Sequence, residues 1–225
     1  KDRFGAEIRT HYPLEVADEI AMIRQEARLV ADVPEHLLEI IARFTRALRE
    51  SSAVDQTSGV SARFAIAAAE TVAAAALRRA AVTGESRPTA RPIDLESVPP
   101  VLRGKLEFTP GEEGREDEHL EHLLRRATAD TARARLRGID LTPLVEAVSR
   151  APVRTGERVA AAEVVAALPA VEPLAEIGRR LGAAGTEDPG PMASAAELAL
   201  ELLFLTRRLA KEETDDETVS YGSAA

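Results

Sequence analysis

The chain lacks cysteine and has few aromatic residues, and both absences limit the folds available to it. Without cysteine, its 225 residues cannot form a disulfide framework or a thiolate metal site. Aromatic residues make up only 3% of the chain, and much of its 45% apolar content is alanine. A β-rich fold would need more valine, isoleucine, threonine and aromatic residues, whereas alanine has the highest helix propensity. The composition therefore predicts an all-α protein.

Long apolar runs and an excess of positive charge are also missing. The most apolar stretch, residues 65–77, is interrupted by Glu70 and is too short to span a bilayer. No apolar segment of a signal peptide follows Lys1. The formal net charge of -9 disfavours binding to a nucleic-acid backbone. We therefore expect a cytoplasmic protein with neither a membrane nor a nucleic acid as its partner, and the initial lysine suggests a fragment of a longer chain.

The motifs of common phosphate-binding and hydrolytic enzymes are absent as well. The sequence has no Gly-x-x-x-x-Gly-Lys-Ser/Thr loop to cradle phosphates and no Walker B carboxylate cluster after a strand. It has no Ser/His/Asp or Cys/His arrangement of a nucleophilic hydrolase. The chain alone is therefore expected to be inactive as an enzyme.

The first twelve residues differ from the rest of the chain. Apolar or β-branched residues alternate there with polar residues or glycine, as on a short strand. A single strand cannot satisfy its own hydrogen-bond ladder. Residues 1–12 are therefore interpreted as the last strand of a sheet that this chain does not contain.

From residue 13 onward the apolar residues recur with a helical period, and a turn at 109–114 divides the expected helices into two groups. The expected helices cover residues 13 to about 27, 34–48, 63–81, 94 to about 106, 115–137, a segment from 142, 161–168, 173–181 and 191–212. The chain is thus predicted to form one helical domain at 13–108 and another at 109–213. The polar, acidic residues 214–225 are predicted to form a disordered tail.

Three short segments carry a resemblance to a known family. Asp2-Arg3-Phe4 precedes the expected strand, Gly59-Val60-Ser61-Ala62-Arg63 opens the longest helix of the first half, and Val98-Pro99-Pro100-Val101-Leu102-Arg103 closes that half. In this order they resemble the end of the core, the sensor 2 segment and the end of the lid in AAA+ ATPases of the magnesium chelatase I-subunit/MoxR type. The resemblance covers about the first 108 residues. It implies that residues 13–108 are the lid and that the nucleotide-binding core lies outside this chain.

The resemblance assigns catalytic roles to two arginines. Arg3 corresponds to the arginine finger, whose guanidinium reaches the nucleotide of a neighbouring subunit and neutralises charge on the transferred phosphoryl group. Arg63 corresponds to the sensor 2 arginine, which also contacts the cofactor, at a helix end whose N–H groups favour anions. Alternatively, Arg3 is an ordinary surface arginine and Arg63 points into solvent from a capped helix.

The resemblance also implies a cofactor and partners. ATP and Mg²⁺ would bind mainly to the missing core, and Tyr12, at the hinge between core and lid, would contact the adenine; equally, Tyr12 could be a packing residue of that hinge. The full protein would work as a homo-oligomeric ring, such as a hexamer, that remodels a partner or a metal-insertion complex. A von Willebrand A-type subunit is the partner expected for this family.

Two other functions remain open at this stage. The second half could be a non-enzymatic helical module that docks a partner, and an exposed leucine stripe on the helix at 191–212 would favour this. The chain could also be the regulatory domain of a sigma-54-interacting transcriptional regulator, although its acidic balance argues against a basic recognition helix.

Two histidines lie near carboxylates, as metal ligands often do. His119 and His122 lie among Glu116, Glu118 and Glu121, a spacing that resembles half of a di-metal carboxylate motif. No second helix repeats the pattern, so a solvated, charged helix face is expected and no metal site is assigned. His11 and His36 stand alone and are interpreted as surface or structural residues.

Overall fold

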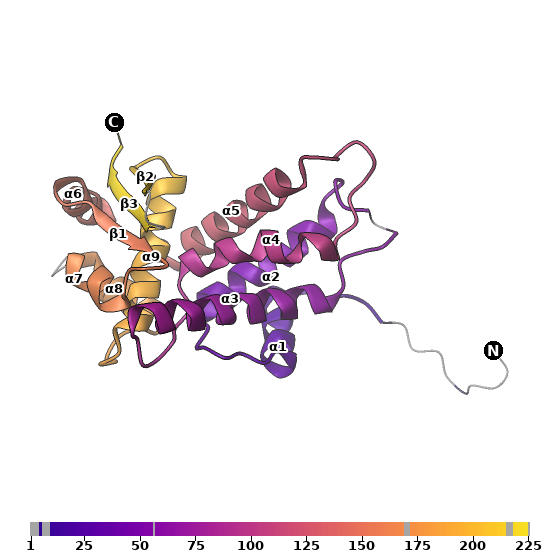
Figure 1. Ribbon diagram of the computed structural model, residues 1–225, viewed down its shortest axis with the longest axis horizontal. Coiled ribbons are helices and arrows are strands. Elements are labelled where there is room, and N and C mark those ends of the chain that lie inside the picture. Colours follow the sequence, from indigo (N-terminus) through magenta and orange to yellow (C-terminus); the bar gives the residue numbers. More distant parts are fainter. Residues whose placement is uncertain (1–4, 6–9, 56, 169–171, 215–217, 225) are drawn as a thin grey trace.

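A bundle of helices forms the first part of the fold. The computed structural model describes residues 5, 10–55, 57–168, 172–214 and 218–224. The bundle consists of α1 (Val16–Glu26), α2 (Glu35–Glu50), α3 (Ala62–Thr83), the short helices η1 (Pro92–Ser97), α4 (Val98–Leu102) and η2 (Arg103–Lys105), and α5 (Glu116–Arg135). Helix α2 packs against both α3 and α5, and α1 crosses the pair α2 and α3 (Figure 1).

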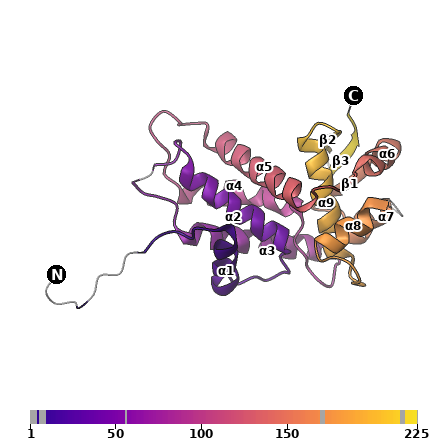
Figure 2. The ribbon, with the colours of Figure 1, turned by 180° about the vertical axis from the view of Figure 1, so that it is seen from behind.

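The second part combines helices with a small sheet at one end of the bundle. It contains α6 (Thr142–Arg150), β1 (Val153–Gly156), α7 (Ala161–Ala167), α8 (Glu172–Arg180), α9 (Pro189–Leu205), β2 (Leu209–Thr214) and β3 (Thr218–Ser223). The strands are antiparallel in the order β1-β3-β2, and the register places Tyr221 of β3 between Val153 and Lys211. Helix α9 packs against α7, α8 and β2. It also packs against α5, and this contact joins the two parts (Figure 2).

Alanine explains why α3 can lie so close to its neighbours. Its alanines at 65, 68, 69, 73 and 76 are fully buried, and their small side chains let the backbones of adjacent helices approach. The helix follows the extended residue Ser61 and ends at Gly84, whose φ of 75° terminates it in the left-handed conformation. With 22 residues, α3 is the longest helix in the described part of the chain.

The prediction of a mostly helical protein is confirmed, but the prediction of a purely helical one is wrong. Residues 191–212 were expected to form a single helix, yet α9 ends at Leu205 and β2 follows. Arg207 takes a φ of 59°, and its amide and that of Arg208 bond back to the carbonyls of Phe204 and Leu203. This left-handed residue ends the helix and turns the chain into the strand.

The predicted disordered tail is also wrong for residues 218–223. These residues form β3, the central strand of the sheet. Thr218 at the start of the strand is buried, and so are its two apolar residues, Val219 and Tyr221. Both side chains lie on the same face of the sheet because residues two apart on a strand share a face. The two apolar residues were too few to stand out in an otherwise polar segment.

The hydrophobic core runs without interruption across the expected domain boundary at 109–114. Buried residues of α2 and α3 belong to the same cluster as Leu120 and Leu124 of α5 and Leu198 of α9. Helix α5, expected to begin the second domain, therefore lies in the bundle. In the described part of the chain, no helix is long and apolar enough to cross a membrane.

The buried ring of Tyr221 provides a test of the sheet. The side chain is 2% exposed, and its hydroxyl donates a hydrogen bond to Glu201 of α9. We expect Tyr221→Ala to lower the free energy of unfolding by about 3 kcal/mol, because it leaves a cavity between sheet and helix. Thermal denaturation followed by circular dichroism measures this, with Ser223→Ala on the same strand as the control. Equal stability of both variants and the parent would show that β3 does not pack as described.

Candidate functional site

Residues 59–63, the segment that resembles sensor 2, lead into the start of α3. Ser61 is extended and precedes the first helical residue, Ala62, so Arg63 lies in the first turn. The Arg63 side chain is exposed, and among the described residues it has no hydrogen bond or ion pair. The first amide groups of a helix have no partners within it, and together with the helix dipole they favour anions. Arg63 thus adds a free positive charge to a helix end that already attracts negative charge.

Tyr12 packs onto the segment that leads into this helix. Its hydroxyl lies so close to Gly59 that a Cβ at that position would stand 2.8 Å away from it. Gly59 also has a φ of 65°, which glycine adopts without strain. The Tyr12 side chain remains 46% exposed. The structure therefore brings Tyr12 next to the segment 59–63, whereas Arg3 lies outside the described residues.

Arg49 of α2 organises this region, and the sequence analysis missed it. Its guanidinium carbon lies 4.2 Å from the centre of the Tyr12 ring, within the range of a cation–π interaction. Both terminal nitrogens bond to Glu19 of α1, at 2.7 and 2.9 Å, and Nε donates to the Val60 carbonyl at 3.0 Å. Glu19 is fully buried. Arg49 therefore links α1, α2, Tyr12 and the segment before Arg63. Glu19 lies three residues after Val16 and four before Ile23, and this spacing on the apolar face of α1 could have signalled a buried carboxylate.

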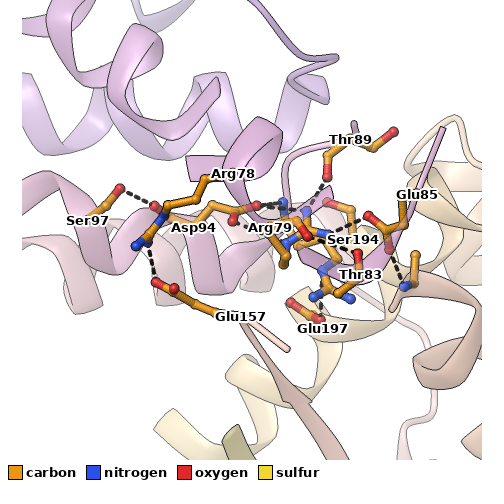
Figure 3. Close-up of polar contacts among 12 residues, drawn as sticks. Arg78, Arg79, Thr83, Glu85, Thr89, Asp94, Ser97, Glu157, Ser194 and Glu197 are labelled. Atoms are coloured by element: carbon orange, nitrogen blue, oxygen red, sulfur yellow. Dashed lines mark hydrogen bonds and ion pairs between the residues drawn. The ribbon is translucent and has the colours of Figure 1, made fainter. Parts of the chain in front are cut away.

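A buried charged network lies at the other end of α3 (Figure 3). Arg79 bonds to both carboxylate oxygens of Asp94 in η1, at 3.3 and 3.1 Å, and to Glu85 at 2.8 Å. Burial alone would lower the pKa of Arg79, but the charge and hydrogen bonds of Asp94, with Glu197 and Glu85, raise it. Arg79 therefore stays charged and ties the end of α3 to η1.

Arg91 extends this network to the sheet and to α9. The fully buried side chain donates to the carbonyls of Gly156 at 3.0 Å and Val159 at 2.9 Å. Its Nε lies 3.4 Å from Glu197 Oε1. Burial raises the pKa of Glu197, and the charges of Arg91 and Arg79 oppose this shift. Each of these charged groups faces an opposite charge, which suits a structural junction between the bundle and the second part.

His36 belongs to the same junction. Its Nε2 lies 2.9 Å from Ser194 Oγ, so the ring connects α2 with α9. Burial, with a smaller effect from the charge of Arg135, lowers the pKa of His36 to about 3. The imidazole is therefore neutral at physiological pH. The interpretation of His36 as a structural residue is confirmed.

The described residues contain no group of three or more histidine, aspartate or glutamate side chains that could hold a metal ion. His119 lies 2.7 Å from Ser51 Oγ, and His122 is exposed. Glu116 is paired with Arg103 on η2. The face of α5 that carries these residues is thus hydrogen-bonded and solvated.

Comparison with known proteins gives no match to a family model, to a curated protein or to a solved structure.

The burial of neutral His36 predicts a specific loss of stability in acid. The pKa is about 3 in the folded state and about 6.5 when unfolded, so the unfolded state binds more protons between these values. The stabilisation is complete above about pH 6.5 and is lost as the pH falls toward 3. We expect this residue to account for up to about 2 kcal/mol of lost stability at about pH 5.

Urea denaturation of the parent, His36→Gln and His122→Gln at neutral and acidic pH measures this contribution. His36→Gln should weaken the pH dependence, and His122→Gln, which changes an exposed histidine, should leave it unaltered. An identical pH dependence in all three proteins would contradict a buried neutral imidazole at position 36.

Proposed function

We propose that the chain is the C-terminal part of a magnesium chelatase-like or MoxR-like AAA+ ATPase, in which it senses the nucleotide and transmits ATP hydrolysis to a remodelled partner. The observation that carries this proposal is the free, exposed Arg63 in the first turn of α3. A surface arginine without an ionic partner at a helix N-terminus suits contact with a phosphate group. Tyr12 lies on the segment just before it, as a residue at the hinge between core and lid would.

The described residues fit one part of an ATP–Mg²⁺ site and not the rest. Arg63 offers charge for a phosphate, and the exposed Tyr12 ring offers a face for a base. No carboxylate cluster of the described part could hold Mg²⁺. In this proposal a core domain outside the chain therefore holds ATP and Mg²⁺, and Arg3 acts across the interface of a homo-oligomeric ring.

The rigid helix α3 provides a route from the nucleotide to the second part of the fold. Arg63 and Arg79 are 16 positions apart on this helix, which corresponds to about 24 Å at 1.5 Å per residue. Arg79 is bonded to Asp94 of η1, and nearby Arg91 is bonded to carbonyls at the end of β1 and beyond it. A displacement of α3 at Arg63 would therefore be carried into the sheet and α9 by buried charged contacts.

The alternative of a helical docking module depended on an exposed leucine stripe near the end of the chain. The leucines of α9 at positions 198, 200, 202 and 203 are buried in the core. They are needed for packing, so these four leucines offer no docking face and do not favour that alternative.

Removing the charge of Arg63 tests the proposed function. In the longer chain that includes the core, we expect Arg63→Ala to reduce kcat for ATP hydrolysis by at least about tenfold, because a positive charge that stabilises the phosphates is lost. Arg63→Lys should retain part of the activity, since the charge remains without the planar fork. Steady-state ATPase assays measure both effects.

Arg87→Ala is the matched control for this experiment. Arg87 is also exposed and, within the described part, has no hydrogen bond or ion pair, but it follows the opposite end of α3. The Arg87→Ala variant should hydrolyse ATP at the parent rate. Parent-like turnover of Arg63→Ala, or an equal loss in Arg87→Ala, would refute the sensor role.

A further inference from the structure

A groove of about 580 Å³ lies between α5, the η1–α4 segment, the end of α9 and strand β2. Its apolar lining comes from Leu95, Pro99, Pro100, Leu124, Phe204 and Leu205. Three of the surrounding elements, α5, α9 and β2, come together where the bundle meets the sheet (Figure 1). None of the residues assigned to nucleotide sensing lines this groove.

The rim of the groove is acidic. Five carboxylates and two cations line it, and both cations are already paired. Lys211 bonds to Glu96 at 2.9 Å and to Glu201 at 2.7 Å, and Arg125 is bonded to Glu121. The Glu213 side chain is exposed and, among the described residues, makes no hydrogen bond or ion pair. The groove therefore carries an excess of negative charge that a basic ligand would neutralise.

Of the two cations, Lys211 cannot easily be released to change this balance. The Lys211 side chain is 14% exposed and lies 5.8 Å from the ring centres of Phe204 and Tyr221. Burial alone would lower the pKa of Lys211, but Glu201 and Glu96 raise it. The Tyr221 hydroxyl also donates to Glu201. These contacts fix one end of the groove as a built, rigid surface.

Strand β2 gives the groove a second means of recognition. The sheet order β1-β3-β2 makes β2 an edge strand, with β3 on one side. Lys211 and Glu213 line the groove, while Glu212, which lies between them, points to the other face of the sheet. Edge strands can pair with an extended segment of another chain, and alternate side chains of that segment then enter the adjacent pockets.

We propose that this groove binds an extended segment of a partner protein in which basic residues alternate with apolar ones. The apolar side chains would lie on the proline and leucine lining, and the basic side chains would approach Glu213 and the other rim carboxylates. Opposite charges placed in this way set the partner and its register. The proposal does not depend on nucleotide binding, so the chain as it stands suffices to test it.

Fluorescence anisotropy with a labelled peptide of alternating leucine and lysine, roughly eight residues long and so within the usual length of a strand, provides the test. We expect saturable, salt-sensitive binding to the chain without nucleotide. Glu213→Lys should weaken this binding about tenfold, because it replaces an attraction with a repulsion. A peptide of alternating leucine and glutamate should not bind.

Glu212→Lys is the matched control, since it changes the net charge by the same amount on the neighbouring residue of β2. Its affinity for the basic peptide should stay within about twofold of the parent value. Equal weakening in both variants would show attraction to the whole acidic protein and would overturn the proposal. Lack of binding by the basic peptide, or equal binding of the acidic peptide, would overturn it as well.

Sedimentation of the chain alone distinguishes a second copy of the chain as the occupant. We expect the parent and Glu213→Lys to sediment alike. Self-association that Glu213→Lys abolishes would show that the groove binds another copy instead, and the proposal of a basic partner segment would then be wrong.

Discussion

The paired contacts of Arg79 and Arg91 are the interaction on which the rest of the structure depends. They lie where α3, η1, the end of β1 and α9 meet, and each brings a charge into a region closed to solvent. An isolated buried charge costs several kcal/mol, so neither arginine could be accommodated without Asp94, Glu197 and the carbonyls around them. The same partners fix the relative position of the bundle and the sheet-bearing part, because hydrogen bonds between charged groups require defined distances and angles. An apolar contact of similar size would allow sliding, whereas the directional hydrogen bonds from Arg91 to the carbonyls of Gly156 and Val159 do not.

The helical part of the fold could be predicted from the sequence to a large extent. Alanine content and apolar spacing indicated α2, α3 and α5, and the observed bounds of α5, Glu116–Arg135, lie within two residues of the expected range. The periodic signal works there because a helix that covers a core repeats its apolar face over several turns. It failed beyond Leu205, where the helix is ended by the conformation of Arg207 and the following strands are short. Six-residue strands such as β3 carry only two or three inward-facing residues, too few to establish a period.

The predicted domain boundary at 109–114 was based on a turn. A turn in the sequence does not show whether the helices on its two sides pack into the same core. Pro110, Gly111 and Gly114 do interrupt the helices, but α5 returns to lie on α2, and Glu39 of α2 bonds to Arg135 of α5 at 2.7 Å. Similarly, the sequence singled out Arg63 and Tyr12 through resemblance, and could not show that Arg49 and the buried Glu19 hold the surrounding segments in place. Contacts between residues 30 positions apart, such as Glu19 and Arg49, depend on how two helices cross. The sequence around each residue does not show how the two helices cross.

Helix η1 connects the two proposed sites, the nucleotide-sensing end of α3 and the groove. Asp94 of η1 is bonded to Arg79 at the end of α3, and Glu96, two residues later, is bonded to Lys211 on the rim of the groove. A shift of α3 along its axis therefore cannot leave η1 in place without breaking a buried ion pair, which would cost about 3 kcal/mol or more. Moving η1 would in turn displace Leu95, Glu96 and the adjacent prolines that form one wall of the groove. If Arg63 responds to nucleotide as proposed, the width of the groove would then depend on nucleotide state. The short path through Asp94 and Glu96 would then couple the position of Arg63 to the holding and release of the proposed basic segment.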